Sequence, residues 1–263
     1  MNANPHERPH YPRILSIAGS DCGGVAGIQA DLKTCAALGC YGMSTITAIT
    51  AQNTCGVHAI QPVSADVVRA QIEAVVSDIG VAAVGVGMLQ SIELVQEDAQ
   101  TLRQYAVPWI VFDPVMIASS GDSLMEPDTA EVLVRELFPL ATVVTPNLHE
   151  ASFLLKRPIQ YAHQLTTAAQ DLQRMGAPAV LLKGGHLTEQ QVGAEVTDVL
   201  LYQAQGAWQS QSYTSPRIAS ANTHGTGCTL SSAIACYLAL GQTLPEAVAQ
   251  ARAYIIQAID SGQ

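Results

Sequence analysis

The sequence predicts an α/β fold in which helices cover both faces of a central, mostly parallel sheet. Short β-branched runs alternate with longer stretches of helical periodicity, an order typical of βαβ units. The predicted strands are almost continuously apolar, which indicates burial on both faces. A chain of 263 residues can bury one large core, and no stretch inside it has the composition of a linker. We expect a single domain at 13–263, preceded by a disordered leader at 1–12 without the apolar segment of a signal peptide.

The predicted elements alternate along the chain. A strand at Arg13–Ala18 leads into a helix at about Val25–Leu38. Further helices are expected at Asp66–Ile79 and Thr129–Leu137, where apolar residues recur at helical spacing. The remaining buried strands are short β-branched runs: Ala82–Val86, Trp109–Phe112, Thr142–Thr145 and Val180–Leu182.

Two regions depart from this alternation. Residues Tyr41–Val63 show alternating Ser, Thr and Ile with two glycines, a pattern that favours strands. These strands form either a small β flap that projects over a ligand or an ordinary edge of the sheet. Residues Val196–Tyr213 are predicted as a pair of strands with Gly206 at the turn.

Composition narrows the classes of partner. The formal net charge is −10 and the pI is near 5.0, which argues against nucleic acid or an anionic membrane as partner. No uninterrupted apolar run is long enough to span a bilayer. The six cysteines form no C-x-x-C pair and match no zinc-ligand spacing, so we expect a reducing, cytoplasmic environment. A small soluble molecule is therefore the expected partner, with no nucleic acid and no membrane.

The stretch Asn222–Cys228 contains two glycines and lies directly before the apolar run Thr229–Ala235. Glycines followed by a helix make an anion site, because the first amides of the helix have no intrahelical partner. The same field favours a thiolate, so we expect the pKa of Cys228 to lie below the roughly 8.5 of a free cysteine. The stretch lacks the Lys-Ser/Thr ending of a P-loop, and Gly19–Gly27 lacks G-x-G-x-x-G spacing. It indicates phosphate chemistry outside the P-loop and dinucleotide-binding classes.

Polar or glycine-rich clusters follow five of the predicted strands. Because the carboxyl ends of parallel strands meet at one edge of a sheet, these clusters are expected to line one site. The five clusters are Gly19–Gly24, Gly87–Met88, Asp113–Met116, Pro146–Glu150 and Lys183–His186.

Several of these side chains have two interpretations. Asn147 and Glu150 can act together near Mg²⁺, or they mark a helix N-terminus in which Glu150 favours the dipole, and spacing alone favours the second. Asp113 either positions a metal ion or the phosphate acceptor, or caps the turn at Pro114. Lys183 is a phosphate-directed cation or a solvated strand end.

Further residues are candidates for binding the substrate, and the first of them, Asp31, has two interpretations. Asp31 either reaches the rim of the sheet from the first helix or pairs with Lys33 on the surface. Gln52 and Asn53 follow a Thr-rich strand, where their side chains can read the donors and acceptors of a heteroaromatic ring. Met88 would form one side of the pocket with a flexible, polarizable side chain.

Together these motifs resemble those of the hydroxymethylpyrimidine/phosphomethylpyrimidine kinases, thiamine-biosynthesis members of the ribokinase-like superfamily. The resemblance runs from about Arg13 to the end of the chain. The motifs that carry it are Ala18–Asp21, Gly27–Thr34, Ala51–Thr54, Gly87–Leu89, Asp113–Met116, Thr145–Asn147, Lys183–Leu187 and Asn222–Cys228. It implies a three-layer ribokinase-like fold with a small β flap. It also implies a kinase that uses ATP and Mg²⁺, with a monovalent cation as an option, to phosphorylate 4-amino-5-hydroxymethyl-2-methylpyrimidine and then its monophosphate.

The resemblance also implies roles for individual residues. The pyrimidine pocket is implied to consist of Gly19, Asp31, Gln52, Met88 and Val115. Asn147 and Glu150 match the Mg²⁺ motif N-x-x-E, with Asp113 as a further metal residue and water completing the set. The residues implied to contact ATP phosphates are Asn147, Lys183, Thr226 and Gly227. The catalytic group is implied to be Lys183, Gly225, Gly227 and Cys228, with Cys228 as the proposed base.

Other interpretations remain. Pyridoxal or pyridoxamine kinases carry almost the same motifs, and a non-catalytic pyrimidine or nucleotide sensor on this fold is a second alternative. A cysteine hydrolase is disfavoured because His224 is too close in sequence to Cys228. The chain departs from the family at Cys22 and Ser119, which puts phosphate contacts there in doubt. We expect a homodimer in which the strands at Tyr41–Ala51 pair across a two-fold axis.

Overall fold

The computed structural model describes residues 11–117, 124–126, 128–185, 187, 194–220 and 222–261. Its strands form one sheet in the order β3-β2-β1-β4-β5-β6-β7-β8-β9. The strands are β1 (Arg13–Asp21), β2 (Tyr41–Asn53), β3 (Gly56–Pro62), β4 (Ala83–Val86), β5 (Ile110–Phe112), β6 (Val143–Val144), β7 (Val180–Leu182), β8 (Glu195–Ala204) and β9 (Ala207–Pro216). The neighbours from β2 to β7 are parallel, whereas β3, β8 and β9 pair antiparallel at the two edges. The predicted α/β class with a mostly parallel sheet is confirmed.

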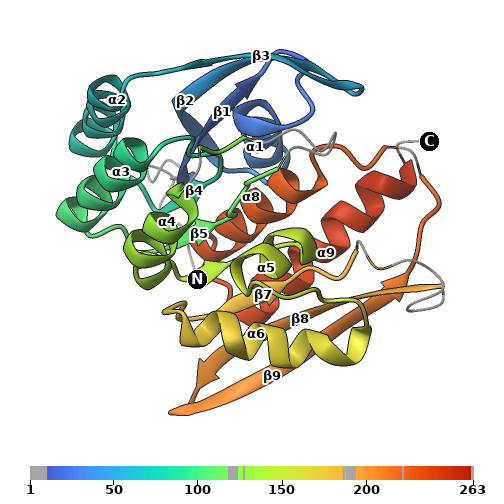
Figure 1. Cartoon of the computed structure of the whole chain (residues 1–263). Helices are drawn as coiled ribbons and strands as arrows, with labels where there is room; N and C mark the ends of the chain where they lie inside the picture. Colours follow the sequence, from blue (N-terminus) through green and yellow to red (C-terminus); the bar gives the residue numbers. More distant parts are fainter. Residues whose placement is uncertain are drawn as a thin grey trace, which may run out of the picture.

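Helices cover both faces of this sheet (Figure 1). They are α1 (Gly27–Ala37), α2 (Ala65–Asp78), α3 (Ile92–Tyr105), α4 (Thr129–Leu137), α5 (Leu148–Leu154), α6 (Leu165–Arg174), α8 (Thr226–Ala239) and α9 (Leu244–Ser261). One core packs under α2 to α6 and a second packs under α1, α8 and α9. The three layers follow from the near-continuous apolar strands, because successive strand residues face opposite sides.

The central strands show this alternation directly. Val84 and Ile110 belong to the first core, whereas Ala83 and Val111, their neighbours in sequence, belong to the second. The prediction of strands at Val180–Leu182 and a helix at Thr129–Leu137 matches the observed bounds, and the other predicted elements differ by a few residues at their ends. Within the described residues, no helix is both long and apolar enough to cross a membrane.

The two irregular regions occupy opposite ends of the sheet (Figure 1). The last residues of β2 pair with β3 over Ala48–Asn53. β3 is an edge strand of the sheet, and its Val57 and Ile60 pack on a small cluster that contains Met88. That β3 projects over a ligand stays a prediction. At the other end, β8 and β9 form the predicted hairpin with Gly206 at its turn.

In the first half of β2, the backbone groups of Ile46 are paired with a side chain of the neighbouring helix. The side chain of Gln71 on α2 accepts a hydrogen bond from the Ile46 N–H at 3.0 Å and donates one to the Ile46 carbonyl at 3.2 Å. The backbone groups of Ile46 are therefore paired within the chain, whereas Tyr41 and Ile49 on the same strand are more than half exposed. Strand pairing across a two-fold axis stays a prediction.

Candidate active site

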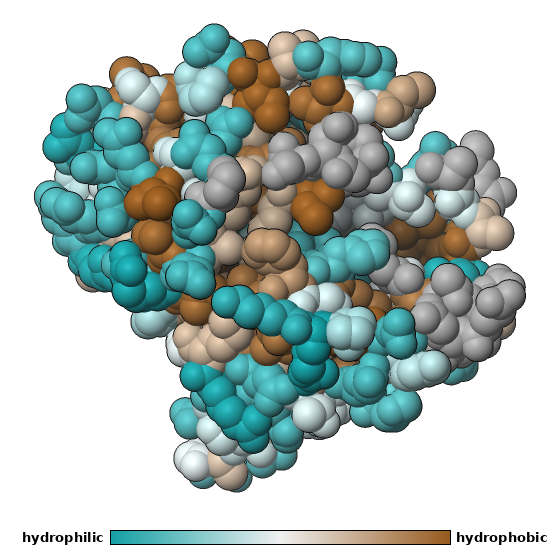
Figure 2. Space-filling view, viewed as in Figure 1, coloured by the Kyte–Doolittle hydropathy of each residue, from teal (hydrophilic) through white to brown (hydrophobic). Residues whose placement is uncertain are grey.

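One cavity of about 660 Å³ lies at the carboxyl ends of the parallel strands. Of the residues that the sequence predicted for the site, Asn53 does not line this cavity. The others do: Gly19, Asp31, Gln52, Met88, Asp113, Val115, Asn147, Glu150, Lys183, Gly225, Thr226, Gly227 and Cys228. Figure 2 shows a hollow with apolar surface inside it on the right side of the molecule. The strand-end clusters therefore converge as predicted, while the role of each residue remains a prediction.

The N-terminus of α8 contacts the loop that precedes α1. Gly225 is the N-cap and adopts the left-handed region with φ 79°. A Cβ at Gly225 would lie 1.7 Å from the carbonyl oxygen of Val25, so no other residue fits. This close approach places the free amides of α8 at the cavity, as an anion site requires.

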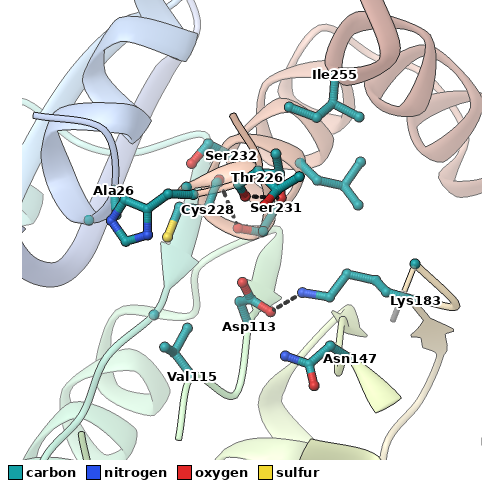
Figure 3. Close-up of a pocket in the computed structure, with 18 of the residues that line it drawn as sticks. Ala26, Asp113, Val115, Asn147, Lys183, Thr226, Cys228, Ser231, Ser232 and Ile255 are labelled. Atoms are coloured by element: carbon teal, nitrogen blue, oxygen red, sulfur yellow. Dashed lines mark hydrogen bonds and ion pairs between the residues drawn. The ribbon is translucent and has the colours of Figure 1, made fainter. Parts of the chain in front are cut away.

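Lys183 and Asp113 face each other in front of these amides (Figure 3). Lys183 Nζ lies 2.8 Å from Asp113 Oδ1, which also accepts a bond from Thr145 Oγ1 at 3.0 Å. Burial acts to lower the pKa of Lys183, but the carboxylates of Asp113 and Glu150 outweigh it and raise that pKa. The interpretation of Lys183 as a solvated strand end is therefore wrong. Lys183 is a largely buried cation with a 13% exposed side chain, and it lies beside Gly227, whose lack of a side chain leaves room for both charged groups.

Asn147 and Glu150 form a capping box at the start of α5. Asn147 Oδ1 accepts from the N–H groups of His149 and Glu150, and Glu150 Oε2 accepts from the Asn147 N–H at 2.8 Å. This geometry confirms the helix N-terminus that spacing alone favoured. Burial raises the pKa of Glu150 to about 7; the Lys183 charge opposes the rise and the Asp113 charge adds to it.

This arrangement also fits a magnesium ion. Asp113 and Glu150 are two buried carboxylates that share one lysine, so a divalent cation would relieve their repulsion with the hard oxygen ligands that Mg²⁺ prefers. Across the described ranges, no three His, Cys, Asp or Glu side chains gather closely enough to hold a metal by themselves. The metal set of Asp113, Asn147 and Glu150 therefore requires water or phosphate oxygens and stays a prediction.

Asp31 is buried where α1 meets α8. Its Oδ2 accepts from Ser16 Oγ at 2.5 Å, and its Oδ1 accepts from Ser232 Oγ at 2.5 Å. Burial raises the pKa of Asp31 to about 6, the two serine bonds oppose the rise, and the charge of Asp113 adds to it. The alternative of a surface pair is wrong, because Lys33 instead donates to the carbonyl of Gly24.

Cys228 lies between the two helix termini. It is the third residue of α8, and its side chain is hydrogen-bonded to the backbone of Gly27, the first residue of α1. Burial raises the pKa of Cys228 to about 12, and the carboxylates of Asp31 and Asp113 add to the rise. The prediction of a pKa below that of a free cysteine is wrong, because burial and two nearby anions outweigh the helix terminus and Lys183.

Asp21 organises the loop before α1, a role that was not predicted from the sequence. Its carboxylate accepts hydrogen bonds from the amides of Gly23, Val25 and Ala26, and Gln52 is a further partner. Burial acts to raise the pKa of Asp21, but these bonds outweigh it and lower that pKa. Asp21 thus shapes the loop against which Gly225 packs. An Asp directly followed by small residues is a signal for such a turn.

The far end of the cavity is apolar and was also missed. It is lined by Val196, Pro216, Ile218, Ile255, Ile256 and Ile259. The spacing of the isoleucines along α9 marks one helix face, which sequence periodicity assigns to the core rather than to a site. Ser119 and His186 lie outside the described residues.

Comparison with known proteins identifies the family. The family model for phosphomethylpyrimidine kinase matches residues 21–263. The hydroxymethylpyrimidine/phosphomethylpyrimidine kinase of Rhizobium meliloti is 51% identical over 248 residues, which cover 94% of this chain and 90% of that protein.

Solved structures agree with this assignment. The crystal structure of phosphomethylpyrimidine kinase from Clostridium difficile superimposes with a TM-score of 0.79 at 42% identity, covering 94% of this chain and 99% of that chain. The pyridoxal kinase of Staphylococcus aureus in complex with pyridoxal gives 0.84 at 33% identity, covering 96% and 89%. The predicted ribokinase-like fold is confirmed. Because the family model matches 21–263 and the Rhizobium meliloti relative is 51% identical over most of both chains, the chain belongs to the phosphomethylpyrimidine kinase family.

Proposed function

We propose that this protein transfers phosphate from ATP to the hydroxymethyl group of 4-amino-5-hydroxymethyl-2-methylpyrimidine, and then to the resulting monophosphate. The observation that carries the proposal is one cavity that joins an anion-binding helix terminus to a polar pocket. Lys183 and Gly227 lie at the helix terminus, and Asp31, Gln52 and Met88 lie in the pocket. Family membership supports the same reaction.

The arrangement suits phosphoryl transfer. Such reactions depend mainly on positioning and on stabilisation of the charge on the transferred group. The amides at the start of α8 and the cation of Lys183 are held by packing before any ligand arrives, so they need little reorganisation. Cys228 is the side chain proposed to accept the proton of the hydroxymethyl group.

The cofactors of the proposed reaction are ATP and Mg²⁺. When bound, Mg²⁺ supplies neutralisation of phosphate charge, and Asp113, Glu150 and Asn147 are the residues proposed to hold it with water. The apolar end of the cavity at α9 is proposed to receive the base of ATP, because a heteroaromatic ring buries well against isoleucine side chains. A monovalent cation rests on the family resemblance alone.

A second candidate is a pyridoxal kinase. The observation that favours it is the pyridoxal complex of the Staphylococcus aureus enzyme, whose fold matches this chain with a TM-score of 0.84. A pyridine with a hydroxymethyl group would present its substituents to the same Asp31 and Gln52. The first candidate is preferred because the relative from Rhizobium meliloti is 51% identical over most of the chain.

A coupled kinase assay tests the proposal. Hydroxymethylpyrimidine, its monophosphate and pyridoxal are supplied separately with ATP and Mg²⁺, and formation of ADP is followed. We expect turnover of both pyrimidines, with kcat/KM for pyridoxal lower by at least about 10-fold, since one lost polar contact costs that much. A higher kcat/KM for pyridoxal would establish the second candidate. Binding of ATP with no turnover of any acceptor would instead indicate a sensor.

Two further features belong to the proposal. All six cysteines are free, which supports the predicted reducing, cytoplasmic location. A homodimer remains the expected assembly, supported by the exposed Tyr41 and Ile49 of β2. Sedimentation analysis of the purified protein would decide the assembly.

A further inference from the structure

Asp198 on β8 and Arg252 on α9 form a buried ion pair in the wall of the cavity. Each residue is only 7% exposed, and Arg252 Nε lies 2.7 Å from Asp198 Oδ2. The guanidinium also lies over the ring of Tyr213, 5.6 Å from its centroid, and donates to Ser215 Oγ at 3.4 Å. The arginine is therefore fixed by contacts with two strands before any ligand binds.

The other oxygen of Asp198 holds the peptide bond that follows Lys183. Asp198 Oδ1 accepts the N–H of Gly184 at 2.8 Å in a buried position. A side chain cannot fit at Gly184, because a Cβ there would lie 2.0 Å from the carbonyl oxygen of Thr197. On its other side, the N–H of Lys183 donates to the carbonyl of Pro146 at 2.9 Å. The main chain is thus held on both sides of the lysine that faces the anion site.

We propose that Asp198 and Arg252 are positioning residues for Lys183. Arg252 orients the carboxylate of Asp198, Asp198 fixes the Lys183–Gly184 peptide, and the fixed peptide places Lys183 Nζ in front of α8. This inference rests on the proposed kinase function. It assigns a role to two side chains that lie on the last strand pair and the last helix, outside the motifs that identified the site.

The chemistry explains why both partners are needed. Without Arg252, the buried carboxylate of Asp198 would have no counter-charge at Oδ2, and its orientation toward the Gly184 N–H would no longer be fixed. Loss of Arg252 would therefore loosen the bond from Gly184 as well as the ion pair. A small displacement of a positioning group costs up to about 10²-fold in rate even when the group itself is unchanged.

A double-mutant cycle between Arg252→Met and Lys183→Met tests the proposal. We expect Arg252→Met alone to lower kcat about 10- to 100-fold, with KM for the pyrimidine little changed. In the Lys183→Met background the same change should cost less than about 2-fold, because the lysine on which Arg252 acts is absent. Arg252→Lys, which keeps a cation for Asp198, should recover most of the kcat.

A matched control separates positioning from folding. Arg157→Met breaks the partly exposed ion pair with Asp171 in the second half of α6 and should leave kcat unchanged. Thermal unfolding of each variant is recorded, and kcat is expressed per folded molecule. Equal losses from Arg252→Met in both backgrounds, or no recovery with Arg252→Lys, would overturn the proposal. If Arg252→Met does not fold, the same cycle is run with Asp198→Asn, which keeps an acceptor for Gly184 but presents an amide donor to Arg252.

A second measurement tests this proposal independently of the proposed kinase activity. It is the affinity for ATP, measured by titration calorimetry, which requires no phosphate acceptor. Arg252→Met should weaken ATP binding in the wild-type background and leave it unchanged beside Lys183→Met. If the wild type binds ATP but phosphorylates neither pyrimidine, the proposed function fails while this cycle still decides whether Arg252 acts through Lys183.

Discussion

Carboxylates are buried both at the rim of the cavity and on the core-facing side of helix α3. Only those at the rim have hydrogen-bond or charged partners among the described residues. At the rim, Asp31 accepts bonds from two serine hydroxyls and Asp113 accepts them from Lys183 and Thr145. On α3, Asp98 is fully buried, and neither of its oxygens has a hydrogen-bond partner in the part of the chain that the structure describes.

The presence or absence of partners changes the pKa values of these buried carboxyl groups. Burial raises the pKa of Asp98 to about 8, with a further rise from Glu97 beside it. Burial raises the pKa of Asp31 only to about 6, because its serine bonds oppose the rise. Asp98 is therefore mostly a neutral acid at pH 7, and its burial costs stability without serving the cavity. Buried charge indicates a site here only where cations, hydroxyls or amides converge on it.

The largest expected effect comes from removing the cation of the rim. Lys183→Met should lower kcat by roughly 10³-fold in both phosphorylations, because a preorganised group that stabilises the transferred phosphoryl is lost. Steady-state kinetics with each acceptor measures this, and Lys156→Met, an exposed lysine outside the cavity, is the matched control. A decrease in kcat of less than about 10-fold would show that Lys183 is not one of the catalytic residues.

A more selective effect is expected from the thiol. Cys228→Ala should slow phosphorylation of the alcohol by about 10²-fold, the lower end for a general base, because the transition state is largely dissociative. Phosphorylation of the monophosphate should change far less, since that acceptor is already ionised near neutral pH. Separate assays of the two steps decide this, and equal losses in both would exclude Cys228 as a dedicated base. Cys236→Ala is the control within the same helix.

The raised pKa of Cys228 also predicts a pH dependence. Because its pKa is raised to about 12, the thiolate fraction grows with pH over the whole stable range. If the thiolate accepts the proton, kcat/KM for the alcohol should rise with pH up to at least about 9 without a plateau, and the Cys228→Ala variant should lose this rise. A plateau near neutral pH in the wild type would assign the proton to another group.

The smallest expected effect lies in α3 and concerns stability. Burial raises the pKa of Asp98 from the usual 3.8 of an aspartate to about 8, so between these values the folded state holds a proton that the unfolded state releases. Its contribution to stability is therefore fully present below pH 4 and is lost as pH rises through 8. Asp98→Asn should remove this slope and raise the free energy of unfolding at pH 8 by roughly 1–3 kcal/mol.

Urea unfolding between pH 5 and 8.5 measures this change. Asp78→Asn, an exposed acid at the end of α2, should leave the slope as in the wild type. Activity should be unaffected in both variants, since neither residue lines the cavity. A slope that is unchanged in Asp98→Asn would show that Asp98 is ionised or paired in the folded protein.

Much of the fold and site followed from local pattern. The apolar strands, the glycines at 225 and 227, and the polar clusters after strands were all placed from sequence, because burial and positive φ leave local signals. The position of Asp31 at the rim was one of two open alternatives, since helical spacing cannot tell a serine partner on α8 from a surface lysine. The pKa of Cys228 was predicted in the wrong direction, because the carboxylates of Asp31 and Asp113 are distant in sequence.

The sequence by itself determined the α/β class, the convergence of the strand-end residues and the phosphate character of the site. Only the tertiary structure decided which charges meet. Asp31 and Ser232 are separated by 201 positions, and Lys183 and Asp113 by 70. Hydrophobic periodicity and the positions of glycines indicate the local structure of the segment in which they occur. The ionisation of a side chain depends instead on groups that are distant in sequence and that packing brings within a few ångströms. The protonation of Cys228 and the ion pair that holds the Lys183 loop belong to this second kind of information.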